Sequence, residues 1–340
     1  MALGRLFTAA VAFAATVAAL PVGFHVEEPD VITTITLTTA ATFTQTIARA
    51  TPTPTGVESG GYTPPSLPSG PKNGSSGLPG ISYAPYRRDH QCKTKDQVKN
   101  DIDRLGGSYS LVRIYGTDCD QVPVVYSCAK ENNMKVFLGI WDLDSVQKEA
   151  QKIIDGVDGD WSIVSTISVG NELVNKGEAS PEKVLSAVKQ ARQILRAAGY
   201  EGPVVTVDTF VAVGANPELC AESDYCAINA HAFFDPTISA DEAGTWLSKT
   251  IDDLKAKLPK DQRIVVCESG WPVKGKANGL AVPGLAEQKV AISAIEKAFA
   301  GHMEDLILFS AFNDPWKKEE AWSFNAEPYW GIDGAVSSSD

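Results

Sequence analysis

The chain has 340 residues, of which 44% are hydrophobic and 21% are charged, and its net charge is −12. This composition fits a globular protein of one large domain or two ordinary ones. It argues against a nucleic-acid partner, because a polyanion would be repelled and no basic cluster offsets the repulsion. The 4 His and 6 Cys lack zinc-type spacing, so no metal or cofactor is expected, and no apolar run is long enough for a transmembrane helix.

Residues 1–19 are predicted to be a secretory signal peptide. Arg5 precedes an almost uninterrupted apolar run from Leu6 to Leu20, and the small residues of Val17–Ala19 offer a cleavage site. A short anchor helix is the alternative, but the length of the run and the lack of flanking charge disfavour it. We therefore expect a secreted protein that has no membrane association once the signal is removed.

Residues 20–80 are predicted to be a disordered linker. Thr recurs through residues 33–46, and Pro and Gly dominate residues 52–80. Such a segment cannot bury enough apolar surface to offset the entropy of ordering it. Secreted segments rich in Thr, Ser and Pro are often O-glycosylated, and the sequon Asn73-Gly74-Ser75 lies in the same stretch.

Residues 81–340 alternate between short apolar runs and amphipathic stretches, which predicts strands and helices in turn. Strands are expected at Ile81–Tyr83, Leu111–Tyr115, Lys135–Ile140, Ile163–Val169, Pro203–Asp208, Ala227–Ala230, Arg263–Cys267 and Leu306–Phe309. Helices are expected at Lys95–Leu105, Gln121–Asn132, Ser145–Val157, Pro181–Ala198, Pro217–Glu222, Ala240–Leu258 and Gly284–Phe299. Apolar strands separated by helices indicate a parallel sheet buried on both faces, and eight such units favour an α/β fold, the (β/α)₈ TIM barrel. An open doubly wound sheet is the alternative, but its Gly-rich phosphate turn is missing.

Two carboxylates stand at predicted strand ends, where the chemistry of a barrel is found. Glu172 ends the fourth strand and Glu268 the seventh, each after an apolar run in which a charge is costly unless it is used. A pair of carboxylates at one barrel mouth suits glycoside hydrolysis, with one as proton donor and the other as nucleophile or base. Glu172 and Glu268 are therefore the candidate catalytic residues.

Other side chains at the strand ends are candidates for sugar binding. Amides bond sugar hydroxyls, and aromatic rings offer flat faces to pyranose rings. These candidates are Tyr83, Tyr115, Asn171, Phe234, Trp271 and Trp316. Arg113, on a buried strand, needs a partner and is expected to support the surroundings of the nucleophile. Asp208 is expected to cap a helix or join a polar network, with a sugar contact as the alternative.

Two strand-end motifs resemble the signatures of glycoside hydrolase family 17. They are Ser168-Val169-Gly170-Asn171-Glu172 and Glu268-Ser269-Gly270-Trp271-Pro272. The resemblance extends through Val112–Tyr115 and Phe312–Lys317 and covers about residues 81–333. The family contains β-1,3-glucanases and glucanosyltransferases.

This resemblance implies a retaining reaction on β-1,3-glucan, with Glu172 as acid/base and Glu268 as nucleophile. The Thr-rich linker is similar to that of fungal cell-surface mannoproteins of the family, which implies a place in the cell wall. Two positions depart from the family pattern. Asp314 stands where members usually carry Glu, and His231 stands where strand six commonly ends in Tyr. Both are counted among the substrate-binding candidates, and His231 is expected to bond the carboxylate of the nucleophile.

The six cysteines fall into three groups. Cys92 and Cys119 lie in neighbouring loops at the predicted barrel mouth, and Cys220 and Cys226 enclose a short loop before strand six. Both pairs are expected to form disulfides in an oxidising compartment. Cys128 and Cys267 are expected to be free and buried.

Three functions remain open at this point. The first is a secreted cell-wall enzyme that hydrolyses β-1,3-glucan with retention. The second is a glucanosyltransferase that uses the same site with a sugar hydroxyl in place of water. The third is a non-catalytic wall adhesin or structural mannoprotein, against which the intact Glu172 and Glu268 argue. In each case the expected partner is β-1,3-glucan, and the protein is expected to be a monomer.

Overall fold

The structure is a computed structural model that describes residues 77–258 and 262–334. The predicted signal peptide (1–19) and most of the predicted linker, up to residue 76, lie outside the described residues. Within the described residues, no helix is long and apolar enough to cross a membrane.

Eight parallel strands form a closed barrel in chain order, and β1 pairs with β8 to complete it. The strands are β1 (Gly80–Ser82), β2 (Leu111–Arg113), β3 (Lys135–Ile140), β4 (Val164–Asn171), β5 (Val204–Thr209), β6 (Cys226–Asn229), β7 (Ile264–Ser269) and β8 (Leu306–Leu308). Each predicted strand is found, and each of its ends lies within two residues of the predicted end. The predicted TIM barrel is confirmed.

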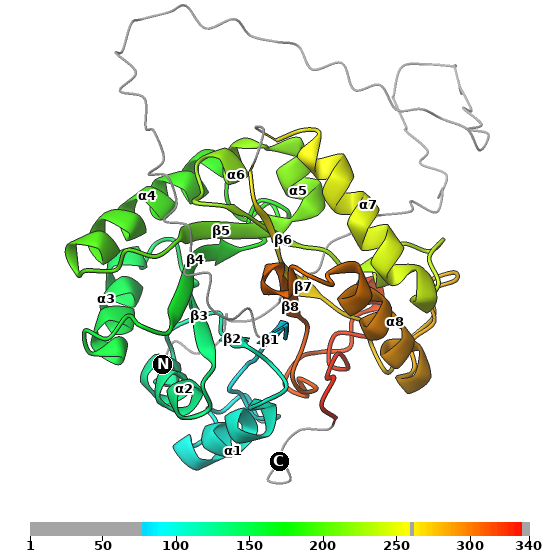
Figure 1. Cartoon of the computed structure of the whole chain (residues 1–340), viewed down its shortest axis with the longest axis horizontal. Helices are drawn as coiled ribbons and strands as arrows, with labels where there is room; N and C mark the ends of the chain where they lie inside the picture. Colours follow the sequence, from blue (N-terminus) through cyan, green and yellow to red (C-terminus); the bar gives the residue numbers. More distant parts are fainter. Residues whose placement is uncertain (1–76, 259–261, 335–340) are drawn as a thin grey trace, which may run out of the picture. The chain divides into compact units, whose positions relative to one another are not determined.

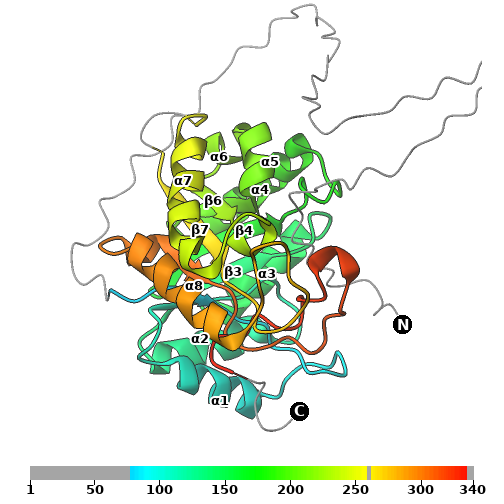
Figure 2. The ribbon, with the colours of Figure 1, turned by 90° about the vertical axis from the view of Figure 1, so that its right-hand side faces the viewer.

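Helices surround the strands on the outside of the barrel (Figure 1). They are α1 (Lys95–Leu105), α2 (Gln121–Glu131), α3 (Val146–Val157), α4 (Pro181–Ala197), α5 (Phe210–Ala215), α6 (Glu218–Ala221), α7 (Ala243–Lys255) and α8 (Leu285–Ala298). Helices α7 and α8 lie side by side on one flank in both views (Figures 1 and 2). Helix α5 is a difference from the prediction. It begins directly after β5 because the Thr209 hydroxyl accepts a hydrogen bond from the Ala212 N–H and caps it.

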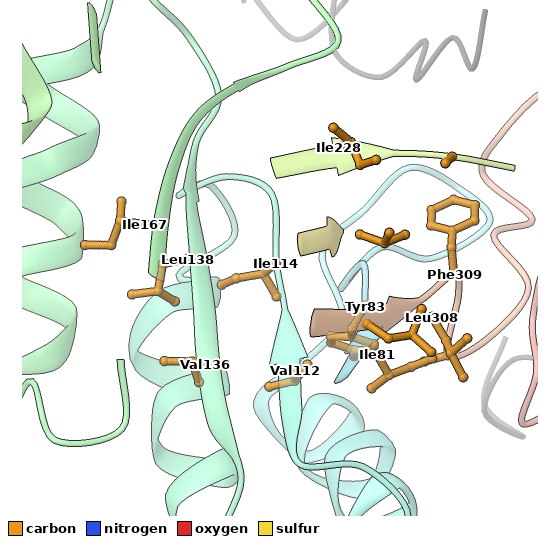
Figure 3. Packing of buried hydrophobic residues seen from close by; sticks show 14 of the residues in the cluster. Ile81, Tyr83, Val112, Ile114, Val136, Leu138, Ile167, Ile228, Leu308 and Phe309 are labelled. Carbon is orange, nitrogen blue, oxygen red and sulfur yellow. The ribbon is translucent and has the colours of Figure 1, made fainter. Parts of the chain in front are cut away.

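Side chains divide into two apolar layers because successive residues of a strand face opposite sides. Val112 on β2 and Ile114 directly after it pack in the layer between the strands and the helices (Figure 3). Arg113, between them, faces the barrel interior, where it bonds Glu268. The interior is filled by a second apolar cluster that includes Phe137, Val207 and Cys267. This packed interior forms the floor on which the polar side chains of the barrel mouth stand.

Both predicted disulfides are present, and they lie at opposite ends of the barrel. Cys92–Cys119 joins the loop after β1 to the loop after β2, at the mouth. Cys220–Cys226 joins α6 to the first residue of β6, at the other end. Cys128 and Cys267 are free and buried, as predicted.

Candidate active site

Irregular backbone at the end of β4 brings Asn171 and Glu172 to the mouth of the barrel. The pairing of β4 with β5 shifts register between Ser168 and Asn171, and such bulges re-aim side chains beside active sites. Gly170 has φ +76° and Glu172 has φ +60°, both in the left-handed region. Glycine is suited to this conformation, whereas for a glutamate it is a strained one that the surrounding structure must hold in place.

The Glu268 carboxylate, at the end of β7, is surrounded by donors. Its Oε1 accepts hydrogen bonds from the Tyr115 hydroxyl at 2.8 Å and from Arg113 Nη1 at 3.0 Å. Its Oε2 lies 3.4 Å from Nε2 of His231. Burial acts to raise the pKa of Glu268, but His231, Arg113 and Tyr115 together hold that pKa well below its ordinary value. The carboxylate is therefore ionised at neutral pH.

Arg113 connects the two candidate catalytic strands. Besides Glu268, its guanidinium donates to the Cys267 carbonyl at 2.8 Å and to Asn171 Oδ1 at 2.8 Å. It also lies over the ring of Tyr115, at 4.5 Å from the centroid. A buried guanidinium needs such partners to offset its desolvation, and the expected supporting role of Arg113 is met by these contacts.

Glu172 has the opposite surroundings. The side chain is buried, its Oε1 accepts one hydrogen bond from Asn229 Nδ2 at 2.8 Å, and its Oε2 has no protein partner among the described residues. Burial raises the pKa of Glu172 and the negative charge of Glu268 raises it further. Two neighbouring carboxyl groups whose pKa values are pushed apart can serve as an acid and a nucleophile at the same pH.

Glu172 and Glu268 line one pocket of about 560 Å³. Five of the predicted sugar-binding residues also line it: Tyr83, Tyr115, Asn171, Asp314 and Trp316. The Tyr83 hydroxyl donates a hydrogen bond to Asp101 on α1 at 2.8 Å, and this bond orients the ring. Asp314 accepts from the Trp316 indole at 3.1 Å and lies 3.3 Å from the ammonium of Lys317.

The other three predicted sugar-binding residues do not line this pocket. His231 lies beside Glu268, in ring contact with Trp330. Phe234 is packed against Phe324 and Trp330. Trp271 is fully buried and donates its indole N–H to the Val282 carbonyl at 2.8 Å. Sugar stacking on Phe234 or Trp271 does not fit these positions, because their rings belong to the packed core.

Several residues at the site were not among the candidates from the sequence. Asn229, the donor to Glu172, is the next-to-last residue of predicted strand six, so its position near the barrel mouth could have been inferred. Tyr86, Trp141 and Lys317 line the pocket from loops that carry no periodic signal. Asp208, whose role was left open, accepts from the backbone N–H groups of residues 174, 175 and 209, which is the capping alternative.

A second groove, of about 1450 Å³, meets the pocket at Trp141, which lines both. It is formed by the loops after β2, β3 and β4. The β4 loop directly follows Glu172, so the groove extends the pocket on the side of that residue. Among the described residues, no cluster of three or more His, Cys, Asp or Glu side chains is arranged to hold a metal ion.

A buried, unlike pair of glutamates at the ends of β4 and β7 of a closed barrel defines the class as glycoside hydrolase. Comparison with known sequences gives the family. The BtgE/BtgC glycoside hydrolase domain matches residues 80–331, and the chain belongs to this family.

Curated relatives support the assignment. The chain is 42% identical over 261 residues to the cell surface mannoprotein MP65 of Candida albicans, covering 76% of this chain and 67% of the relative. It is 45% identical over 260 residues to the probable family 17 glucosidase SCW4 of Saccharomyces cerevisiae, covering 76% and 66%. The chain thus spans about two thirds of the length of these relatives. The resemblance to family 17 is confirmed.

Solved structures support the fold. A family 17 β-1,3-glucanosyltransferase from Rhizomucor miehei superposes with a TM-score of 0.65 at 23% identity, over 77% of this chain and 95% of the other. An active-site mutant of the Rhizomucor miehei enzyme, in complex with laminaritriose, gives 0.64 at 22% identity, over 78% and 97%.

Proposed function

We propose that this protein is a secreted cell-wall enzyme that hydrolyses β-1,3-glucan with retention of configuration. The observation that carries the proposal is the unlike environment of Glu172 and Glu268 in one pocket. One carboxyl is buried with one neutral donor among the described residues and has a raised pKa. The other is held ionised by Arg113, Tyr115 and His231. Retaining glycosidases need this combination of an acid and a nucleophile.

The reaction runs in two displacements. Glu268 attacks the anomeric carbon and forms a glycosyl ester, while Glu172 gives its proton to the oxygen of the departing sugar. Glu172, now a carboxylate, removes a proton from water as the water attacks the ester. The sugar leaves with its original configuration, and both glutamates regain their starting states.

β-1,3-glucan is proposed as the substrate for two reasons. The pocket combines aromatic walls with polar groups, and it opens at Trp141 into a groove with room for further sugar units of a chain. In addition, curated relatives are named as family 17 glucosidases, and an enzyme of similar fold is described in complex with laminaritriose. A cell-wall location is proposed because a relative is named as a cell surface mannoprotein and because residues 1–19 read as a signal peptide.

The groove beyond Trp141 favours glucanosyl transfer as the second candidate function. Glu172 protonates the leaving sugar, so the side of the pocket that its own loop extends is the side from which an acceptor would approach. An acceptor sugar held there would compete with water for the glycosyl ester. The same two glutamates then serve transfer and hydrolysis.

Product analysis tests both functions. Laminari-oligosaccharides are incubated with the enzyme, sized over time, and followed by NMR for the anomer formed first. Shorter products of β configuration support hydrolysis with retention, and longer products at high oligosaccharide concentration support transfer. An α product would overturn retention. Binding with neither shorter nor longer products would overturn both enzymatic functions and leave the adhesin.

We also propose that the segment before β1, predicted from the sequence as residues 20–80, acts only as a linker and that the catalytic domain begins with Gly80, the first residue of β1. Its composition cannot form a core, and the family domain begins at residue 80. A chain that begins at Pro79 is expected to keep the melting temperature and the activity of the full chain. Loss of either would show that the segment packs on the barrel.

A further inference from the structure

One wall of the pocket is built on an exposed disulfide. Tyr86, in the loop after β1, lines the pocket and is paired with Cys92 in a small antiparallel bridge of the same loop. The Lys93 N–H bonds the Pro85 carbonyl at 2.9 Å and closes this turn. Cys92 is in turn bonded to Cys119 in the loop after β2. The position of Tyr86 thus depends on where Cys92 is held.

Hydrogen bonds also connect the loop after β1 to the loop after β2. The Tyr86 hydroxyl donates to Asp118, next to Cys119, at 2.8 Å. Gln121 donates to the same Asp118 oxygen at 2.7 Å. The ring of Tyr86 then meets Trp316 edge-on, with centroids 5.2 Å apart, and both rings line the pocket. The disulfide, Tyr86 and Trp316 therefore form one continuous wall.

This wall is separate from the groups that set the charge of the catalytic pair. The polar groups next to Glu268 and Glu172 are those of Arg113, Tyr115, His231 and Asn229, which stand on the barrel strands or directly after them. None of them lies in the segment from Tyr86 to Cys92. A displacement of this segment would change the fit of a sugar but not the two carboxyl environments.

The two disulfides differ in accessibility. Cys92 is exposed, and together with Cys119 it lines an open groove of about 720 Å³. Cys220 and Cys226 are 1% and 0% exposed, and the free Cys128 and Cys267 are buried as well. An external thiol can therefore reach the disulfide at the mouth in the folded protein, whereas the second disulfide is shielded.

We propose that the Cys92–Cys119 disulfide is a positioning element of the sugar-binding wall and that its reduction weakens glucan binding while leaving the catalytic chemistry intact. The proposal rests on the proposed glucan-cleaving function. A dithiol reagent reduces this disulfide by thiol–disulfide exchange. One of its thiolates attacks a sulfur of the disulfide, the S–S bond breaks, and the other cysteine leaves as a thiolate. The second thiol of the reagent displaces the first cysteine. The protein gains two thiols, and the reagent becomes a disulfide.

The test uses the folded wild-type protein and dithiothreitol. Alkylation and peptide mapping of one portion should show modification at Cys92 and Cys119 alone. Kinetics of the unalkylated portion on laminari-oligosaccharides should show KM raised about tenfold, the scale of one aromatic contact, with kcat nearly unchanged. Reoxidation should restore KM. Unchanged KM after mapped reduction would overturn the proposal, and would mean that the buried ion pair of Lys93 with Asp101, at 2.7 Å, holds the loop alone.

A matched pair of variants separates positioning from general stabilisation. Cys92→Ala/Cys119→Ala should raise KM as reduction does, whereas Cys220→Ala/Cys226→Ala should lower the melting temperature and leave KM unchanged. Equal KM values in the two variants, or a fall in kcat without a change in KM, would contradict the positioning role. Failure of the proposed function looks different, because the untreated wild-type protein would then have no glucan turnover at all.

Discussion

The two carboxyl groups proposed as catalytic share one pocket but have unlike surroundings. Glu268 faces a guanidinium, a phenol and an imidazole, whereas Glu172 has one amide donor and an oxygen with no protein partner among the described residues. Both are almost fully buried, so burial alone does not distinguish them. The difference shows that the donors, and not the depth of the pocket, decide which glutamate is charged.

Removing the charge of Glu268 should have the largest effect on activity. Glu268→Gln keeps the size of the side chain but removes the attacking oxygen, so glycosyl-ester formation should stop. We expect kcat/KM on laminari-oligosaccharides to fall by roughly 10⁴-fold or more. Glu201→Gln, an exposed glutamate in the loop before β5, is the control and should be fully active. Activity in Glu268→Gln within tenfold of the wild type would remove Glu268 from the role of nucleophile.

Replacing Glu172 should affect only the steps in which a proton is transferred. Glu172→Gln should lower the rate on glucan by about 10²- to 10⁴-fold, the usual contribution of general acid catalysis. A laminaribiosyl fluoride should react with much less loss in its first step, because fluoride leaves without protonation. Azide should rescue the second step in Glu172→Ala, since an anionic nucleophile needs no base. Equal losses on the fluoride and on glucan would contradict the role of Glu172 as acid.

The hydrogen-bond donors to Glu268 and to Glu172 can be removed separately. Tyr115→Phe removes a hydrogen bond that lowers the pKa of Glu268, so that pKa should rise. Because Glu268 must be ionised, the acidic limb of kcat/KM should move to higher pH, by about one unit. The hydroxyl of Tyr200 bonds the Pro203 carbonyl at the far end of the barrel, and Tyr200→Phe should leave the limb in place. An unmoved acidic limb in Tyr115→Phe would show that this phenol does not tune the nucleophile.

A smaller shift of the pH profile is expected when the donor to Glu172 is removed. Asn229→Ala removes a hydrogen bond that lowers the pKa of Glu172, so that pKa should rise further. Because Glu172 must be protonated for the first step, the alkaline limb should move upward by less than about one unit. The acidic limb should not move. A shift of the acidic limb alone would reverse the assignment of the two limbs.

The sequence indicated the barrel and the proposed catalytic pair because both depend on local signals. Apolar runs located the strands, and the amphipathic stretches between them located the helices. The ends of the predicted strands then located Glu172 and Glu268. The walls of the pocket could not be located in this way. Trp271 follows Glu268 closely, yet the path of the loop after β7 turns its ring into the core. Tyr86 reaches the pocket only through a loop held by a disulfide and by Asp118. These positions are set by contacts distant in sequence, for which no periodicity exists.

Trapping the covalent intermediate tests the central claim most directly. A 2-deoxy-2-fluoro laminaribiosyl donor with a good leaving group should load the enzyme faster than the ester is hydrolysed. Intact-protein mass spectrometry should show one added glycosyl group, and peptide mapping should place it on Glu268. The Glu268→Gln variant should not be labelled. An adduct on any other residue, or turnover of glucan by an enzyme that never forms an adduct, would contradict the assignment of Glu268 as the nucleophile.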